Sequence, residues 1–276
     1  MDLDPTGVQP DAHIWERAKR WAFERTVAIY IRKPDGSPKQ WGSGVLVKFG
    51  EAAFLVTASH VMTIMQERVE ILLGAMTPNA RGLVSLGEQL VIRSEEDKLD
   101  LAIARLPARA VDELARAKAF VQHAAVDIER LMPQGRYLVV GYPIEITQTD
   151  HTMKTITIGQ FTHTTMLTNS DSAHPGISIA VANHKDSIAR DREGGRARPP
   201  DLHGVSGCGI WRLWANDQAG DLDQWDETWI RLVGIEHRTV GEAIIGTMAS
   251  HFFEMALRTQ PTEVTLSPSG VTVRFP

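Results

Sequence analysis

The sequence is 276 residues long, which predicts about two domains or one large β domain. Its 43% hydrophobic and 23% charged content is that of an ordinary globular protein, and it excludes a collagen-like, coiled-coil or largely disordered chain. The net charge of −5 argues against a dedicated nucleic-acid binder, because such a domain is normally strongly basic.

The single cysteine, Cys208, excludes an internal disulfide and a multi-cysteine zinc site, and it favours a reducing compartment. The N-terminal residues lack the basic and apolar regions of a secretory signal. The sequence contains no run of about 18 apolar residues, so no transmembrane helix is expected. We therefore expect a soluble, cytoplasmic protein that binds neither membranes nor nucleic acid.

Residues 1–25 are predicted to form a polar tail followed by a helix that Asp11 caps. The apolar positions of this helix recur at helical spacing: Ile14, Trp15, Ala18, Trp21 and Ala22. We expect this stripe to pack on the body of the protein, with binding to a partner as the alternative.

Residues 26–106 are predicted as a first antiparallel β-barrel, because short β-branched or aromatic runs alternate there with turn residues. The turns fall at residues 34–37 and 50–51. The expected strands are residues 26–31, 44–49, 53–57, 69–73, 83–86, 89–92 and 101–106.

Residues 107–130 are rich in Ala, Leu, Arg and Glu, which predicts a helical connector. Residues 131–258 are predicted as a second β-barrel with a closing helix over residues 248–257, and residues 259–276 as a hairpin tail. The strands expected in the second barrel are residues 137–140, 155–161, 177–181, 209–213, 229–235 and 243–245.

Three polar residues stand at the ends of predicted strands. His60 directly follows the apolar run that ends at Ala58, and Asp100 stands before the apolar strand that begins at Leu101. Ser206 lies in the glycine-rich turn of residues 204–209. Each residue alone is weak evidence, but their occurrence in this order, each beside a strand, is difficult to attribute to chance.

These residue types together fit nucleophilic acyl transfer. A serine hydroxyl is a weak nucleophile until a base takes its proton, and an imidazole is suited to that task near neutral pH. A buried carboxylate fixes the imidazole tautomer and stabilises the imidazolium. Glycines beside the serine let backbone N–H groups point at the oxyanion that develops. The chain order His, Asp, Ser matches one known arrangement of such a triad.

The three segments resemble those of the trypsin-like serine peptidases of chymotrypsin fold, especially the disulfide-free bacterial and viral members. The similarity covers residues 26–257, and its motifs are specific only when they occur together. The matching segments are the histidine box at residues 57–60, the aspartate box at 100–103, the nucleophile box at 204–207, Gly141-Tyr142-Pro143 and Leu232-Val233-Gly234-Ile235.

The resemblance implies an all-β fold of two antiparallel six-stranded β-barrels, flanked by an N-terminal and a C-terminal helix, with the active site between the barrels. It implies a serine endopeptidase that cleaves polypeptides through an acyl-enzyme, with no cofactor and no metal. His60 would be the general base and then the general acid, Asp100 its orienting group and Ser206 the nucleophile. The backbone N–H groups of Gly204 and Ser206 would form the oxyanion hole.

Three positions depart from the family pattern. Val205 stands where many secreted members have an aspartate that receives a newly cleaved N-terminus, so the enzyme is expected to be constitutive or regulated by a partner. Cys208 and Gly209 replace the usual glycine and proline, which changes the start of the strand but no catalytic group. Ser59 replaces the commoner alanine.

The family alignment also suggests residues for specificity. Asp201 falls near the expected pocket floor, where an acid would favour Lys or Arg at the cleaved position. His237 and Arg238 fall near the strand that would pair with substrate, and an arginine there could instead favour acidic side chains. The charged segment 185–203 is interpreted as a solvated loop, or as a mobile loop that orders the site when a partner or substrate binds. The acidic segment 217–227 is interpreted as a surface loop or as a docking surface for a basic partner.

Four alternatives remain. An α/β-hydrolase requires glycine where Cys208 stands and a βαβ alternation, and a zinc hydrolase requires clustered ligands such as a His-Glu-x-x-His pair, which the sequence lacks. Cys208 could be the nucleophile instead, but it lies two residues after Ser206, the nucleophile position of the box. A catalytically idle, peptidase-shaped binding module is the strongest rival, although the presence of His60, Asp100 and Ser206 together argues against it. A separate protein that regulates the enzyme or delivers its substrate is a further expectation.

Overall fold

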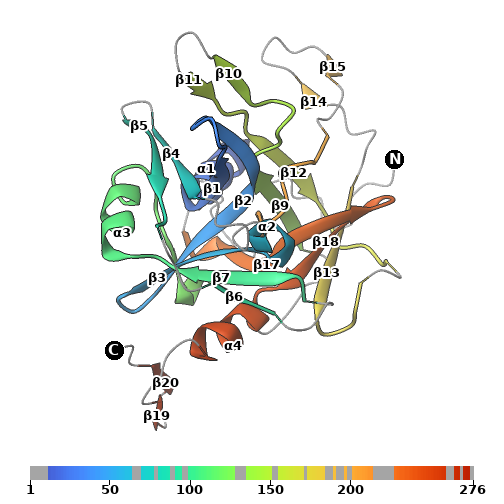
Figure 1. The fold of residues 1–276 in the computed structure, drawn as a ribbon. Coiled ribbons are helices and arrows are strands. Elements are labelled where there is room, and N and C mark those ends of the chain that lie inside the picture. The colour runs from blue at the N-terminus through green and yellow to red at the C-terminus, as the bar shows by residue number, and fades with distance from the viewer. Residues whose placement is uncertain are drawn as a thin grey trace.

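Two antiparallel β-sheets, with a few helices around them, form most of the protein (Figure 1). The all-β class is confirmed, whereas two closed six-stranded barrels are not evident. In the described residues the first sheet is an open series of strands, and in the second the segment after β12 (Phe161–Thr165) meets β13 (Ser178–Ala182), at the other end of the sheet, through the single bridge of Leu167 with Val181. The computed structural model describes residues 12–63, 70–77, 80–87, 91–94, 99–127, 135–150, 155–170, 173–183, 189–190, 196–197, 201–213, 227–258, 264–267 and 270–273.

The first sheet has the strand order β5-β4-β1-β2-β3-β7-β6, with β8 added in parallel beside β2. Its strands are β1 (Thr26–Arg32), β2 (Pro38–Phe49), β3 (Ala52–Ala58), β4 (Ile71–Thr77), β5 (Ala80–Ser85), β6 (Val91–Arg93), β7 (Leu101–Arg105) and β8 (Val121–Gln122). Strand β2 begins six residues before the predicted start at residue 44. The extra residues pair with β1 across a bulge at Ile29/Tyr30, a tertiary pairing that their mixed polar and glycine sequence does not reveal.

The second sheet has the strand order β12-β9-β16-β17-β18-β13. Its strands are β9 (Arg136–Gly141), β12 (Phe161–Thr165), β13 (Ser178–Ala182), β16 (Gly209–Leu213), β17 (Ile230–Val240) and β18 (Ala243–Met248). The prediction of one strand over residues 155–161 is wrong, because β11 (Thr155–Thr157) pairs with β10 (Gln148–Asp150) instead. Gly159 separates β11 from β12, and a Cβ there would lie 2.5 Å from the Ile146 carbonyl oxygen.

The helices are α1 (Ala12–Arg25), α2 (Ser59–Met62), α3 (Ala108–Leu114) and α4 (Ser250–Arg258), with short 3-10 turns η2 (His123–Ala125) and η3 (Glu227–Trp229). In its described part, the predicted connector is α-helical over α3, joins the first sheet as β8 and then forms the 3-10 turn η2. The tail forms the predicted hairpin, β19 (Val264–Ser267) with β20 (Gly270–Val273), which projects from the body in Figure 1. A short β14 (Ala189–Arg190) pairs with β15 (Arg196–Ala197), and Asp11 lies outside the described residues.

One apolar cluster is shared by both sheets and by helices α1 and α4. Trp21 of α1 meets Trp211 of β16 edge to face at 5.5 Å, and Phe252 of α4 packs on Phe49 of β2 at 5.2 Å. Aromatic pairs of this kind add about 0.5–1.5 kcal/mol to the burial energy. This shared core fixes the two sheets relative to each other.

Lys118, after α3, ties the same halves together through polar contacts. Its Nζ donates to the carbonyl oxygens of Phe23 (3.0 Å) and Thr26 (2.8 Å) and to the Tyr142 hydroxyl (3.0 Å). Burial lowers the pKa of Lys118 to about 8. Among the described helices, none is long and apolar enough to cross a membrane.

Candidate active site

Strand pairing in the first sheet brings His60 and Asp100 together. Strands β3 and β7 are antiparallel neighbours, and Ala58 at the end of β3 lies opposite Leu101 at the start of β7. His60 follows β3 in the short helix α2, and Asp100 immediately precedes β7. The two residues, 40 positions apart in the sequence, therefore meet at the same edge of the sheet.

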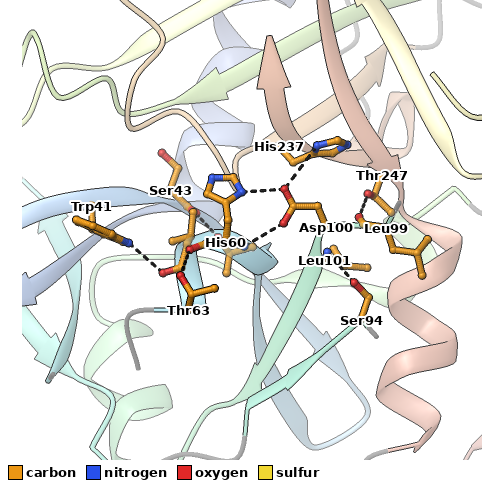
Figure 2. Close-up of polar contacts among 12 residues, drawn as sticks. Trp41, Ser43, His60, Thr63, Ser94, Leu99, Asp100, Leu101, His237 and Thr247 are labelled. Atoms are coloured by element: carbon orange, nitrogen blue, oxygen red, sulfur yellow. Dashed lines mark hydrogen bonds and ion pairs between the residues drawn. The ribbon is translucent and has the colours of Figure 1, made fainter. Parts of the chain in front are cut away.

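Both carboxylate oxygens of Asp100 accept hydrogen bonds from His60, as Figure 2 shows. Oδ1 accepts the backbone N–H of His60 at 2.9 Å, and Oδ2 lies 2.8 Å from Nδ1 of the ring. Because the carboxylate favours a proton on Nδ1, Nε2 of the neutral ring carries the lone pair and can act as a base. The His60 side chain is 49% exposed, so Nε2 belongs to a ring that substrate and solvent can reach.

The backbone around Asp100 is held by both sheets. Asp100 has φ of 36°, the one positive value at a non-glycine position among the described residues. Its carbonyl oxygen accepts the N–H of Ser59 at 3.0 Å, and the preceding carbonyl, that of Leu99, accepts the hydroxyl of Thr247 from β18. Positive φ at a non-glycine residue costs energy and persists only where the surroundings enforce it.

Asp100 is held ionised by its partner. Burial alone would raise its pKa, but the hydrogen bonds that His60 donates and the attraction of its imidazole outweigh burial, and the pKa lies below its usual range. The negative charge is thereby fixed beside the ring on which a positive charge would form.

Two buried titratable residues of β17 lie behind Asp100. Nδ1 of His237 is 3.6 Å from Oδ2 of Asp100, and burial lowers the pKa of His237 to about 4. Burial, together with the charge of Asp100, raises the pKa of Glu236 to about 8. The sequence prediction placed His237 in a substrate pocket, whereas the structure places it against Asp100. Glu236 was missed, and its one sequence signal is an acid after the apolar run Leu232-Val233-Gly234-Ile235.

Ser206 lies in a turn just before β16, and Ser43 of β2 holds this turn from the other sheet. The N–H of Ser43 donates to the Ser206 carbonyl oxygen at 2.9 Å, and its hydroxyl donates to the Gly204 carbonyl oxygen at 2.8 Å. The same hydroxyl accepts the N–H of Tyr142 at 3.1 Å. Sequence reasoning missed Ser43, for which the only signal is a serine between two glycines just before the predicted strand that begins at residue 44.

Close backbone packing brings the same turn to the strand and helix that carry His60. Gly207 has φ of 93°, and a Cβ there would lie 2.0 Å from Oγ1 of Thr57 in β3. A Cβ on Gly42 would lie 2.8 Å from Cγ1 of Val61 and 3.2 Å from the Ser206 carbonyl oxygen. The residue after His60 and the backbone of Ser206 thus flank the same glycine.

The backbone N–H groups in this turn alternate between engaged and free. Those of Val205 and Gly207 donate to the carbonyl oxygens of Leu202 (2.9 Å) and Glu236 (2.7 Å). Within the described part of the chain, the N–H groups of Gly204 and Ser206 donate to no protein acceptor. Gly204 has φ of 92°, a conformation that a side chain would strain. The two free donors are the pair that the sequence analysis nominated for an oxyanion hole.

The Ser206 side chain is half-buried, and no hydrogen bond joins its hydroxyl to His60 among the described contacts. Cys208 is fully buried in an apolar cluster, and burial raises the pKa of its thiol well above the usual range. A buried, protonated thiol is a poor nucleophile, which disfavours Cys208 in that role. The Ser206 turn leads into strand β16 of an antiparallel sheet, which does not fit the strand-to-helix turn of an α/β-hydrolase.

The other two residues suggested for specificity, Asp201 and Arg238, are both exposed. Asp201 is exposed, and its Oδ1 accepts the N–H of His203 at 3.1 Å within its own turn. Arg238 is exposed on β17. Most of segment 185–203 and the acidic residues before Glu227 lie outside the described residues. Where the chain is described, no group of three or more His, Cys, Asp or Glu side chains is arranged to hold a metal ion.

Comparisons with known proteins give little further information. No protein-family model matches the chain, and no curated protein matches its sequence. A solved structure described as "Aromatic interactions drive the coupled folding and binding of the intrinsically disordered Sesbania mosaic virus VPg protein" is similar over 83% of this chain and 87% of that chain. It is 15% identical with a TM-score of 0.44, a likeness that carries no argument about family or function.

Proposed function

We propose that this protein is a serine endopeptidase of chymotrypsin-like fold, with His60, Asp100 and Ser206 as its catalytic triad. The observation that carries the proposal is the pairing of His60 with both oxygens of Asp100. Such a pairing fixes the ring orientation and leaves Nε2 as the base, which is what an acid–base histidine requires.

In the proposed reaction, Nε2 of His60 takes the hydroxyl proton of Ser206 as Oγ attacks the scissile carbonyl carbon. The resulting oxyanion is stabilised by the N–H groups of Gly204 and Ser206. The C–N bond then breaks, and the proton moves from His60 to the leaving amine, which gives an acyl-enzyme. Water, deprotonated by His60, attacks the ester, and the released Ser206 oxygen recovers the proton. Asp100 stays ionised throughout.

Regulation and location are part of the same proposal. Val205 is fully buried among apolar residues, so activation by a cleaved N-terminus pairing with a charge at this position is disfavoured. We therefore propose a constitutive enzyme, or one whose activity or substrate supply depends on a protein partner. The lone, buried Cys208 forms no disulfide, which suits a reducing compartment such as the cytoplasm.

Fluorophosphonate labelling tests the proposal, because this reagent forms a covalent bond only with an activated serine. The wild type should be labelled, and Ser206→Ala and His60→Ala should not. In a peptide hydrolysis assay, each substitution should lower kcat by about 10⁶-fold. Ser178→Ala is a matched control, because Ser178 is a buried serine of the second sheet and no described residue bonds to its Oγ. Equal labelling of the wild type and Ser206→Ala would refute the assignment.

The alternative is a catalytically idle binding module, which is favoured because no hydrogen bond joins Ser206 to His60 among the described contacts. The peptidase proposal requires that this bond form when substrate binds, as catalytic hydrogen bonds often do. The idle module predicts no labelling of Ser206 by fluorophosphonate, with or without added peptides, despite a folded protein.

A further inference from the structure

Asp100 has a second imidazole partner that the catalytic scheme above does not use. His237 of β17 is 7% exposed, and its Nδ1 lies 3.6 Å from Oδ2, the same oxygen that His60 contacts (Figure 2). The other ring nitrogen, Nε2, is buried, and the described residues supply it with no hydrogen-bond partner. Thus the acid of the proposed triad, which comes from the first sheet, is approached by a buried ring from the second sheet.

We propose that His237 is a positioning residue, whose Nδ1–H holds the Asp100 carboxylate in the orientation that His60 requires. This inference rests on the proposed function of the His60–Asp100 pair. It replaces the sequence-based expectation that His237 contacts substrate.

The tautomer of His237 follows from its surroundings. An ionised carboxylate beside Nδ1 favours a proton on that nitrogen, which leaves Nε2 with a lone pair and no proton. The unpaired buried atom is then an acceptor, and a buried acceptor without a partner is tolerated better than a buried N–H. A ring that donates to Asp100 through Nδ1 is therefore expected to leave Nε2 as an acceptor without a partner, as observed in the described residues.

The proposed role also requires that the His237 ring is uncharged. The titratable groups around it are Asp100, Arg238, His60 and the preceding Glu236. Burial and the two nearby cationic groups disfavour a second positive charge, so His237 is neutral and does not cancel the charge of Asp100. A neutral donor orients the carboxylate while its full negative charge remains available to an imidazolium at His60.

At 3.6 Å the contact is longer than a hydrogen bond, which needs about 3.2 Å or less. Bonds of this kind tighten as substrate binds, so we expect the Nδ1–Oδ2 distance to shorten in the acyl-enzyme or a transition-state analogue complex. The contact should therefore affect turnover more than substrate binding.

A variant series at position 237 tests the proposal. His237→Phe keeps a ring and removes the donor, whereas His237→Asn keeps an N–H at the place of Nδ1. Loss of a hydrogen bond to a charged group should lower kcat by about 10- to 100-fold in His237→Phe, with KM within about threefold of the wild type. His237→Asn should stay within about threefold of the wild type. His163→Phe is the control, because it removes another buried imidazole of the second sheet, away from Asp100.

Equal losses in His237→Phe and His237→Asn, or a loss of the same size in His163→Phe, would overturn the proposal, because packing rather than the N–H would then matter. If His237→Phe does not fold, His237→Leu takes its place. A readout without turnover is the NMR signal of the His60 Nδ1 proton, which should exchange faster with solvent in His237→Phe and not in His237→Asn. If the wild type neither hydrolyses peptides nor reacts with fluorophosphonate, the proposed function fails, while this signal still decides whether His237 orients Asp100.

Discussion

The two imidazoles that face Asp100 are chemically identical and lie in opposite environments. The His60 side chain is half-exposed, and the residue makes two hydrogen bonds to the carboxylate, one from its ring and one from its backbone N–H. His237 is buried and makes one longer contact. Burial lowers the pKa of His237 to about 4, which removes it from acid–base chemistry near neutral pH. The comparison shows how surroundings rather than residue type separate a base from a fixed neutral donor.

The two sheets also contribute differently to the site. The His60–Asp100 pair is set by strand register within the first sheet, through the pairing of Ala58 with Leu101. The Ser206 turn belongs to the second sheet, yet its carbonyl oxygens are held by Ser43 of the first. The pair should therefore survive changes that displace the serine turn, and each half can be disturbed separately.

The largest effect among the variants that keep His60 and Ser206 is expected from Asp100→Asn. An amide can donate to Nδ1, which would place the imidazole proton on Nε2 and remove the base. We expect kcat in peptide hydrolysis to fall by about 10⁴-fold while the fold is retained, as circular dichroism would show. A fall of less than tenfold would mean that Asp100 does not set the tautomer of His60.

An intermediate effect is expected from Ser43→Ala, which separates the serine turn from the pair. The substitution leaves the buried N–H of Tyr142 and the carbonyl of Gly204 without their partner, at a cost of about 1–3 kcal/mol. We expect fluorophosphonate labelling to slow by about 10- to 100-fold, with the NMR signal of the His60 Nδ1 proton unchanged. Ser178→Ala should label at the wild-type rate. A normal labelling rate in Ser43→Ala would show that the turn does not depend on the first sheet.

Most elements could be predicted from the sequence because their apolar periodicity is strong. Strand β16 was predicted with its observed bounds, and the two strands of the tail pair as a hairpin within a few residues of the predicted bounds. The errors fall where tertiary contacts decide, as at the start of β2, which pairs across a bulge, and at Gly159, where close packing on Ile146 ends a strand.

In the candidate site, too, some residues could be predicted from the sequence, and others depend on tertiary contacts. The sequence pointed to His60 and Asp100 through strand ends that register brings together. It did not reveal Ser43 or Glu236, because a serine in a strand or an acid after an apolar run acquires its role only from a partner on another strand. The roles of the proposed triad remain predictions until the variants are measured.

The smallest expected effect is a pH dependence of stability that arises from Glu236 and His237, the buried titratable residues of β17 beside Asp100. The pKa of Glu236 is raised from 4.5 to about 8 in the folded protein, so folding retains a proton there that the unfolded chain releases. This contribution is complete below pH 4.5 and is lost as the pH rises to about 8. The pKa of His237 is lowered from 6.5 to about 4, so its contribution grows with pH and opposes that of Glu236 below pH 6.5.

Between pH 6.5 and about 8, the loss from Glu236 should therefore no longer be opposed by His237, and it amounts to up to about 1.4 kcal/mol per pH unit. Urea unfolding at several pH values in this window should show the free energy of unfolding of the wild type declining by up to about 2 kcal/mol more than that of Glu236→Gln. Glu254→Gln, at an exposed position of α4, should decline like the wild type. Parallel curves for the wild type and Glu236→Gln would mean that this buried carboxyl is already ionised at neutral pH, and that Asp100 is not the only negative charge behind His60.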